Sequence, residues 1–270
     1  MLCPVDGAEI SDEECLACAA GTPRPASGER CDFEYEHLAA MMDDSGRETA
    51  GISATMLSSP CSRQTWLKTR EPWYMRPDQN YQAYRGTISH LMLEGYPEPG
   101  SITEQRFELR LENGVIVTGK IDKFNPFARR ITDFKSKAEE KDAPQKADRS
   151  YTLQLNTYKY LLKYGWPQER ITHDAKGNEL PVPYEVGVPA GIEIDEMILS
   201  YWTMGWVKRI PVPVMREETI HKHLLKGAAD QDADEIPEIG RFFDPLNPET
   251  KFCAIWCPVR EHCMTAMWGG

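Results

Sequence analysis

The chain has 270 residues, of which 41% are hydrophobic and 27% charged, a composition typical of a globular protein with one substantial domain or one domain and an appendage. Asp and Glu outnumber Lys and Arg by 42 to 31, and the formal net charge of −11 argues against nonspecific coating of DNA by a basic surface. Its apolar runs are too short for a membrane span and its N-terminus lacks the features of a secretory signal, so we expect a cytoplasmic protein without a membrane partner.

The eight cysteines are distributed unevenly along the chain. In a reducing cytoplasm, clustered cysteines indicate metal or redox chemistry rather than disulfides. Four lie in the first 31 residues and three in the last 18, so the simplest partition is four plus four, in which Cys61 joins the C-terminal group. The N-terminal group is Cys3, Cys15, Cys18 and Cys31, and the other group is Cys61, Cys253, Cys257 and Cys263.

Residues 1–45 are predicted to form a small Cys-rich module that is held together by ligands rather than by an apolar core. Its cysteines follow the pattern C-x₁₁-C-x₂-C-x₁₂-C, which supplies the four thiolates of a tetrahedral zinc site. The alternative is a disordered tail that carries cysteines. Residues 46–270 are predicted to form the second, larger domain.

Helix and strand signals divide the larger domain. Ser59-Pro60 predicts a helix start, with segment 61–70 helical, and a second helix is predicted over about residues 79–94. Residues 103–136 predict a three-stranded antiparallel meander, because polar and apolar residues alternate on both sides of Asn113-Gly114, a strong signal for a two-residue hairpin.

The remaining elements follow a helix predicted over residues 150–164, which ends at Gly165. Residues 172–193 predict a long loop or insertion with a short hairpin. Two more strands are predicted over 193–204 and 207–215, and the prolines of the second confine it to a sheet edge. A short amphipathic helix is predicted after them.

The second and third strands of the meander carry the residues that indicate chemistry. Asp133 and Lys135 lie at i and i+2 on the third strand and therefore share a face, and hairpin pairing can bring Asp122 beside them. Such a group is costly to bury unless its carboxylates share a cation, and oxygen ligands suit Mg²⁺ or Mn²⁺. Metal-assisted phosphodiester hydrolysis fits this set, with Lys135 stabilising developing charge. For an isolated D-x-K tripeptide, the alternative is exposed strand charges.

Residues on the flanking helices extend this set. His90 lies on the helix before the meander, and a neutral imidazole there can serve as a further metal ligand. Gln154 and Tyr158, at i and i+4 on the helix after it, share a face and can hydrogen-bond a phosphate or stack on a base. Taken singly, the histidine fits a structural or surface role, and the pair fits ordinary helix surface and core.

The order of these residues resembles the RecB-type branch of the PD-(D/E)XK nucleases, from about residue 56 to the C-terminus. The resemblance is closest to the iron–sulfur subgroup, which includes the CRISPR-associated RecB-like adaptation nucleases and AddB-type exonucleases. It is carried by Ser59–Gln64, Arg85-Gly86-x-x-x-His90, Asp122, Asp133-Phe134-Lys135 and Gln154-x-x-x-Tyr158. It implies a restriction-endonuclease-like α/β fold, in which helices flank a mixed central sheet. The small zinc-binding module predicted from the N-terminal cysteines lies outside this resemblance and precedes that fold.

The resemblance also implies an activity and partners. The expected protein is a Mg- or Mn-dependent deoxyribonuclease, an exonuclease that acts on single-stranded or end-containing DNA. Its partners would be DNA and a CRISPR integrase, helicase or recombination protein. The alternative is a scaffold subunit of an integrase or helicase assembly that binds DNA without cutting it. The intact set of Asp122, Asp133 and Lys135 favours the enzyme.

The family pattern assigns roles to individual residues. His90, Asp122, Asp133 and the backbone carbonyl of Phe134 would bind the metal, and Lys135 would be the catalytic lysine. Gln154 and Tyr158 would contact the nucleic acid near the scissile phosphate, and Glu104 is a secondary candidate for the site. A [4Fe–4S] cluster would be bound by Cys61, Cys253, Cys257 and Cys263.

The C-terminal cysteines depart from the family spacing of C-x-x-C-x₅-C. Three residues separate Cys253 from Cys257, whereas five separate Cys257 from Cys263. This difference leaves open whether the four thiolates hold iron–sulfur or zinc. In either case we expect a structural role, because ligation to Cys61 closes a loop of about 190 residues.

Overall fold

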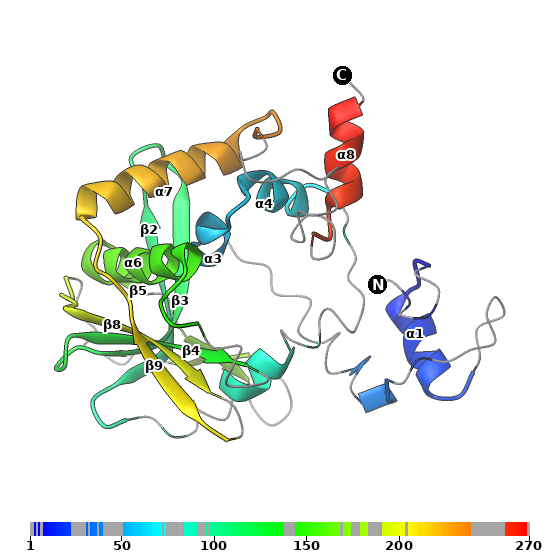
Figure 1. Ribbon diagram of the computed structural model, residues 1–270, viewed down its shortest axis with the longest axis horizontal. Helices are drawn as coiled ribbons and strands as arrows, with labels where there is room; N and C mark the ends of the chain where they lie inside the picture. Colours follow the sequence, from blue (N-terminus) through cyan, green and yellow to red (C-terminus); the bar gives the residue numbers. More distant parts are fainter. Residues whose placement is uncertain are drawn as a thin grey trace. The chain divides into compact units, whose positions relative to one another are not determined.

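The computed structural model describes a chain with two compact units (Figure 1). The sheet unit comprises Thr49–Ser62 and His90–Pro237, and the cysteine unit comprises Met1–Glu48, Arg63–Ser89 and Glu238–Gly270. This division differs from the predicted boundary near residue 45, because two later segments cluster with the N-terminal one. The structure describes residues 3, 5, 8–22, 31, 33–36, 38–39, 51–71, 73, 81, 84–90, 96, 98–137, 144–167, 170–173, 179–182, 191–202, 205–238 and 257–268.

A mixed seven-stranded sheet forms the centre of the sheet unit. Six strands lie in the order β5-β2-β3-β4-β8-β9, and β1 pairs with β3. The β4–β8 and β1–β3 pairs are parallel, and the other pairs are antiparallel. The strands are β1 (Ile52–Ser53), β2 (Ile102–Arg110), β3 (Ile116–Asn125), β4 (Arg130–Ser136), β5 (Trp166–Pro167), β8 (Glu196–Trp202) and β9 (Val207–Pro211).

The meander β2-β3-β4 is where the alternating pattern predicts it, and β9 lies at the sheet edge, as its prolines require. The first turn is one residue longer than predicted. Leu111 pairs with Val115 around a three-residue loop, and Gly114 has a φ of +85°. That left-handed conformation is typical of three-residue hairpin loops. The predicted hairpin in the insertion is also present, as the separate antiparallel pair β6 (Arg170–His173) and β7 (Glu179–Val182).

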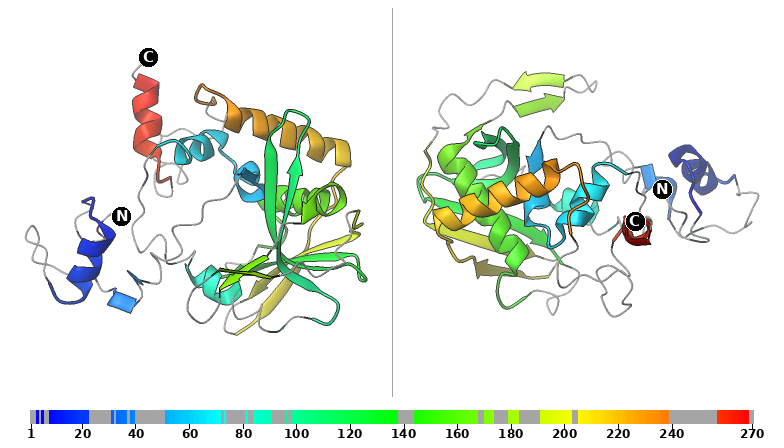
Figure 2. Two further views of the ribbon diagram at one scale, coloured as in Figure 1. Left: turned by 180° about the vertical axis from the view of Figure 1, so that it is seen from behind. Right: turned by 90° about the horizontal axis from the view of Figure 1, so that it is seen from above.

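Helices of the sheet unit cover the sheet in two layers. The helix α6 (Arg149–Tyr164) contacts β2, β3 and β4, and α7 (Glu217–Asp232) packs on α6 (Figure 1; Figure 2, left). A helix that the sequence did not predict, α3 (Ala54–Ser58), contacts both of them. The apolar face of α6 explains this arrangement, because Leu155, Leu161 and Leu162 are fully buried in the core of the unit. In the part of the chain that the structure describes, every helix is too short or too polar to span a bilayer.

Close packing of α6 on β3 depends on Gly119. A Cβ atom there would lie 2.7 Å from Leu161 Cδ1 and 2.9 Å from Tyr158 Cε1, both on buried side chains. We therefore expect Gly119→Ala to lower the free energy of unfolding by about 1–3 kcal/mol, the usual cost of overpacking a core. Urea denaturation measures this loss. Gly205→Ala is the matched control, because a Cβ atom at Gly205 meets no atom within 4 Å; equal stability of the two variants would contradict the packing argument.

The helices of the cysteine unit are short. They include α1 (Asp12–Ala19), most of α4 (Ser62–Lys68) and α8 (Arg260–Trp268). The start of α1 is fixed by a capping box, in which Ser11 accepts a hydrogen bond from the Glu14 amide and the Glu14 carboxylate accepts one from the Ser11 amide. The helix predicted over segment 61–70 is present as α4 and begins two residues after Pro60.

Candidate metal centre

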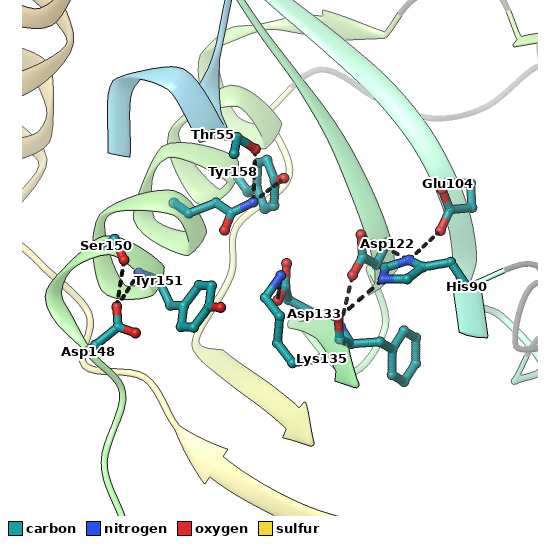
Figure 3. A network of polar contacts seen from close by, with 12 residues as sticks. Thr55, His90, Glu104, Asp122, Asp133, Lys135, Asp148, Ser150, Tyr151 and Tyr158 are labelled. Atoms are coloured by element: carbon teal, nitrogen blue, oxygen red, sulfur yellow. Dashed lines mark hydrogen bonds and ion pairs between the residues drawn. The ribbon is translucent and has the colours of Figure 1, made fainter. Parts of the chain in front are cut away.

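Three side chains from the sheet unit converge, those of Glu104 on β2, Asp122 on β3 and His90 (Figure 3). His90 Nδ1 lies 3.3 Å from Glu104 Oε1 and 3.6 Å from Asp122 Oδ1. Among the residues that the structure describes, this is the only group of three or more His, Cys, Asp or Glu residues whose ligand atoms all lie within 4.8 Å of one another. One nitrogen and two carboxylates form a donor set that fits a divalent cation such as Mg²⁺ or Mn²⁺.

Glu104 reaches this group through an unusual backbone conformation. It lies opposite Asp122, between the pairs Thr103–Lys123 and Gln105–Ile121 of the β2–β3 ladder. Its φ of +52° is rare for a residue with a side chain and costs of order 1–3 kcal/mol. Strain of this size is characteristic of functional sites, where the surroundings hold the residue in place. The sequence made Glu104 only a secondary candidate for the site. In the structure its carboxylate lies with the ligand atoms of His90 and Asp122.

Phe134 contributes both of its main-chain polar groups to the site. Its N–H donates to Asp122 Oδ2 at 2.8 Å, and its carbonyl oxygen lies 3.2 Å from His90 Nε2. The β3–β4 ladder runs only from Asn125–Arg130 to Lys123–Thr132, so the Asp122 side chain replaces the next main-chain partner of β4. The site therefore lies where two strands stop pairing, and this leaves room for side chains between them.

Asp133 and Lys135 are in contact beside this group, as their shared strand face predicts. Lys135 Nζ lies 2.6 Å from Asp133 Oδ2, and the Asp133 side chain is only 1% exposed. No donor among the described residues reaches Asp133 Oδ1. A buried carboxylate oxygen without a donor is costly, and a cation relieves that cost. Asp133 is not one of the three residues with ligand atoms within 4.8 Å of one another.

The electrostatics of the site reflect an excess of buried carboxylates. Burial and the neighbouring Asp133 raise the pKa of Asp122 to about 7, although His90, Lys135 and the Phe134 N–H oppose the shift. Burial opposes the charge of Lys135, but Asp133 and Asp122 outweigh it and hold its pKa above the ordinary value. The hydrogen bond with Glu104 raises the pKa of His90. In the absence of a metal ion, protonation of Asp122 and His90 and the ammonium group of Lys135 thus offset the negative charge of the carboxylates.

Lys120 adds a further cation at the edge of the site. Its Nζ lies 2.5 Å from Glu104 Oε2, and its side chain is 41% exposed. Burial raises the pKa of Glu104, but the hydrogen bonds from His90 and Lys120 outweigh burial and lower it overall. Glu104 is therefore held as a carboxylate that bridges His90 and Lys120.

Gln154 and Tyr158 share one face of α6, as predicted, and contact each other. Gln154 Nε2 donates to the Tyr158 hydroxyl at 2.8 Å and to Thr55 Oγ1 at 3.2 Å (Figure 3). The Tyr158 ring packs against Gly119 and is 4% exposed. This burial argues against the stacking of a base on Tyr158, and a nucleic-acid contact stays a prediction for the pair.

The N-terminal cysteines lie near one another in the cysteine unit. Burial raises the pKa of Cys15 to about 11, and the thiolate charges of Cys31, Cys3 and Cys18 add to that shift. Their sulfur atoms do not form a group of three within 4.8 Å. A small apolar cluster that includes Ile10, Cys15 and Leu38 surrounds them. This cluster also takes in Tyr81 and Tyr84, which lie beyond residue 45.

The remaining cysteines fall in both units. Cys61 is buried in the sheet unit, immediately before α4, whereas Cys257 and Cys263 belong to the cysteine unit. Burial raises the pKa of Cys263, and nearby Cys257 adds to the shift while Arg63 opposes it. Cys253, the fourth predicted ligand, lies outside the described residues.

The fold and the site define an α/β protein in which a mixed sheet carries a candidate metal centre at a gap between β3 and β4. The chain matches no family model and none of the curated proteins. It is similar to the protein SSO0001, whose crystal structure aligns with a TM-score of 0.50 and 18% sequence identity over 86% of this chain and 98% of that chain. At this identity the likeness concerns the fold alone.

Proposed function

We propose that the protein is a metal-dependent nuclease of the RecB-like PD-(D/E)XK type, which hydrolyses phosphodiester bonds of DNA. The observation that carries the proposal is the convergence of His90, Glu104 and Asp122 next to the Asp133–Lys135 pair. Clustered carboxylates beside a half-buried ammonium group suit metal-assisted phosphodiester hydrolysis. The order of the same residues along the chain supports the family.

The residues of the site would have different roles in such a reaction. A bound Mg²⁺ or Mn²⁺ supplies a Lewis acid for the phosphoryl group and lowers the pKa of water. His90, Glu104 and Asp122 would hold this ion, with the free oxygen of Asp133 and the carbonyl oxygen of Phe134 beside them. Lys135 keeps a positive charge within the site, where it stabilises the negative charge that develops on the phosphate oxygens.

A digestion assay tests the proposal directly. End-labelled single-stranded DNA, double-stranded DNA and RNA of one sequence are incubated with the full chain and Mg²⁺, Mn²⁺ or EDTA. We expect loss of DNA from its ends with either cation and none with EDTA, as an exonuclease requires. Tight DNA binding without cleavage under every condition would instead support the scaffold alternative. Cleavage of RNA alone would overturn the substrate assignment.

The cysteines are proposed to bind two structural metal centres. Cys3, Cys15, Cys18 and Cys31 would hold one Zn²⁺, and the clustering of three of these thiols around Cys15 supports this assignment. Cys61, Cys253, Cys257 and Cys263 would hold a [4Fe–4S] cluster, which is supported by the family pattern in the sequence. The proposed partners are DNA and a CRISPR integrase, helicase or recombination protein.

Metal analysis separates the two centres. Full-length protein purified without oxygen is expected to be brown and to contain iron, sulfide and one zinc per chain. Cys61→Ser is expected to remove the iron and leave the zinc, whereas Cys15→Ser removes the zinc and leaves the iron. Both variants should melt at lower temperature, because ligation contributes folding free energy. Loss of both metals in either variant would show that the two groups share ligands.

A further inference from the structure

Lys135 lies near tyrosines from two elements of the sheet unit, and its ammonium group contacts the ring of one of them. Its Nζ lies 4.9 Å from the ring centroid of Tyr151, which is on the first turn of α6. On β8, Tyr201 pairs in register with Lys135 and is fully buried. The charge of Lys135 lowers the pKa of Tyr151, Tyr158 and Tyr201, although burial raises the pKa of each overall. Within the described part of the chain, the ammonium group therefore has one acidic partner, Asp133, and one aromatic contact, Tyr151.

The geometry points to Tyr151 as a positioning residue for Lys135, an inference that rests on the proposed nuclease function. A lysine side chain has four flexible carbons and loses about 2 kcal/mol of rotamer entropy when it is fixed. Among the described residues, Lys135 has one ion-pair partner within 4 Å, Asp133, and its side chain is 20% exposed. The face of an aromatic ring attracts an ammonium group without neutralising its charge. Tyr151 can therefore fix Lys135 while leaving its charge available to a substrate.

The first turn of α6 holds the Tyr151 ring in this place. Asp148 caps the helix, and its Oδ1 accepts hydrogen bonds from the Tyr151 N–H at 2.9 Å and the Ser150 hydroxyl at 2.7 Å (Figure 3). A capping bond of this kind fixes the backbone of the first turn. The Tyr151 side chain is half-buried against the core of the unit, which restricts its rotamers. The capped first turn of α6 thus holds the Tyr151 ring in a fixed position against the flexible Lys135 side chain.

The position of Asp133 explains why Lys135 needs a second contact to fix its side chain. This carboxylate is the ion-pair partner of Lys135, and it is also a candidate ligand of the proposed metal. Negative charge that Asp133 shares with a cation is no longer fully available to Lys135. The contact with Tyr151 does not depend on that charge. It would keep the ammonium group in place in the loaded enzyme as well.

Cleavage kinetics of two Tyr151 variants test this role. Tyr151→Leu removes the ring and is expected to lower kcat about tenfold while KM for the DNA changes less than twofold. Tyr151→Phe keeps the ring face and is expected to retain kcat within about twofold. Tyr160→Leu, on the same helix, is the matched control and should cleave normally. Equal losses in the Leu and Phe variants, or a loss confined to KM, would overturn the proposal.

A double-mutant cycle shows whether Tyr151 acts through Lys135. In a Lys135→Ala background, Tyr151→Leu should cause no further loss of the residual rate, because the group that it positions is absent. An undiminished tenfold loss in that background would refute the assignment. A thermal melt of each variant separates this effect from unfolding.

A measurement without activity distinguishes failure of this inference from failure of the nuclease proposal. Lys135 Nζ lies 4.9 Å from the centre of the Tyr151 ring, so the NMR signals of the adjoining ε-methylene protons should be shifted upfield by the ring current in the wild type and in Tyr151→Phe. In Tyr151→Leu the shift should disappear. If the wild type cuts no nucleic acid but shows this pattern, the nuclease proposal fails and the positioning contact stands. If the pattern is absent, Tyr151 does not position Lys135.

Discussion

Lys135→Ala is expected to abolish metal-dependent cleavage, with a loss of at least about 10²-fold in kcat. Among the described residues, this side chain is the cation paired with the buried Asp133, next to the proposed metal ligand Asp122. The measurement is single-turnover cleavage of end-labelled DNA with Mg²⁺ or Mn²⁺. Lys135→Arg keeps the charge but not its shape, and an intermediate rate is expected.

The matched control for this variant is Lys123→Ala. Lys123 lies on β3, its side chain is 18% exposed, and its Nζ is 2.6 Å from Glu98, so it resembles Lys135 in exposure and in having a carboxylate partner. That partner is 38% exposed, and neither residue belongs to the group of candidate metal ligands. Removal of the Lys123 side chain should leave cleavage unchanged. Because Lys135→Ala leaves Asp133 buried without its ion pair, a lower melting temperature is also expected, and rates are compared only below it. Wild-type cleavage by folded Lys135→Ala would contradict the proposed mechanism.

Asp122→Asn is expected to stabilise the metal-free protein and to eliminate its response to metal. The pKa of Asp122 is raised from an unfolded value near 3.9 to about 7, so the fold loses stability from this group as the pH rises through that interval. Asparagine carries no charge and can still accept the hydrogen bond from the Phe134 N–H. At pH 8 we expect the free energy of unfolding to increase by roughly 1–3 kcal/mol.

Urea denaturation with EDTA and with Mn²⁺ measures both effects. Wild-type protein should gain stability with the logarithm of the Mn²⁺ concentration, and Asp122→Asn should gain little. Asp195→Asn is the control, because Asp195 is 66% exposed and paired with Arg129, and a change within about 0.5 kcal/mol is expected there. An Asp122→Asn protein that is less stable without metal and equally stabilised by Mn²⁺ would refute the site.

Local patterns predicted most of the sheet unit. The alternation of residues 103–136, the helical spacing of residues 150–164 and the prolines at the end of β9 each depend on near neighbours. The three strands of the meander, α6 and the edge strand β9 form as expected. Elements of two to five residues, such as β1 and α3, were missed because they have too few residues for a period. The grouping of residues 63–89 and 238–270 with the N-terminal segment depends on distant contacts that no local pattern encodes.

The candidate site was predictable to a similar extent. Spacing on one strand was enough to place Asp133 beside Lys135. The predicted two-residue loop at Asn113-Gly114 would place Glu104 opposite Lys123, whereas the observed three-residue loop places it opposite Asp122. A one-residue difference in loop length therefore decides whether Glu104 reaches the site. The positive φ of Glu104 and the end of the β3–β4 ladder were not predictable, because both arise from the balance of packing and strain in the assembled sheet.

At Phe134 the main-chain N–H donates to the side chain of Asp122 instead of to a neighbouring strand, and this affects local dynamics. The amide of Phe134 is protected from solvent by the Asp122 carboxylate rather than by a neighbouring main chain. Its hydrogen-exchange rate therefore depends on the orientation of one side chain, whereas exchange at regular β4–β8 positions requires the separation of two strands. Any ion that draws the Asp122 oxygens toward His90 changes the exchange of this amide first, so the backbone of β4 itself acts as a reporter of occupancy.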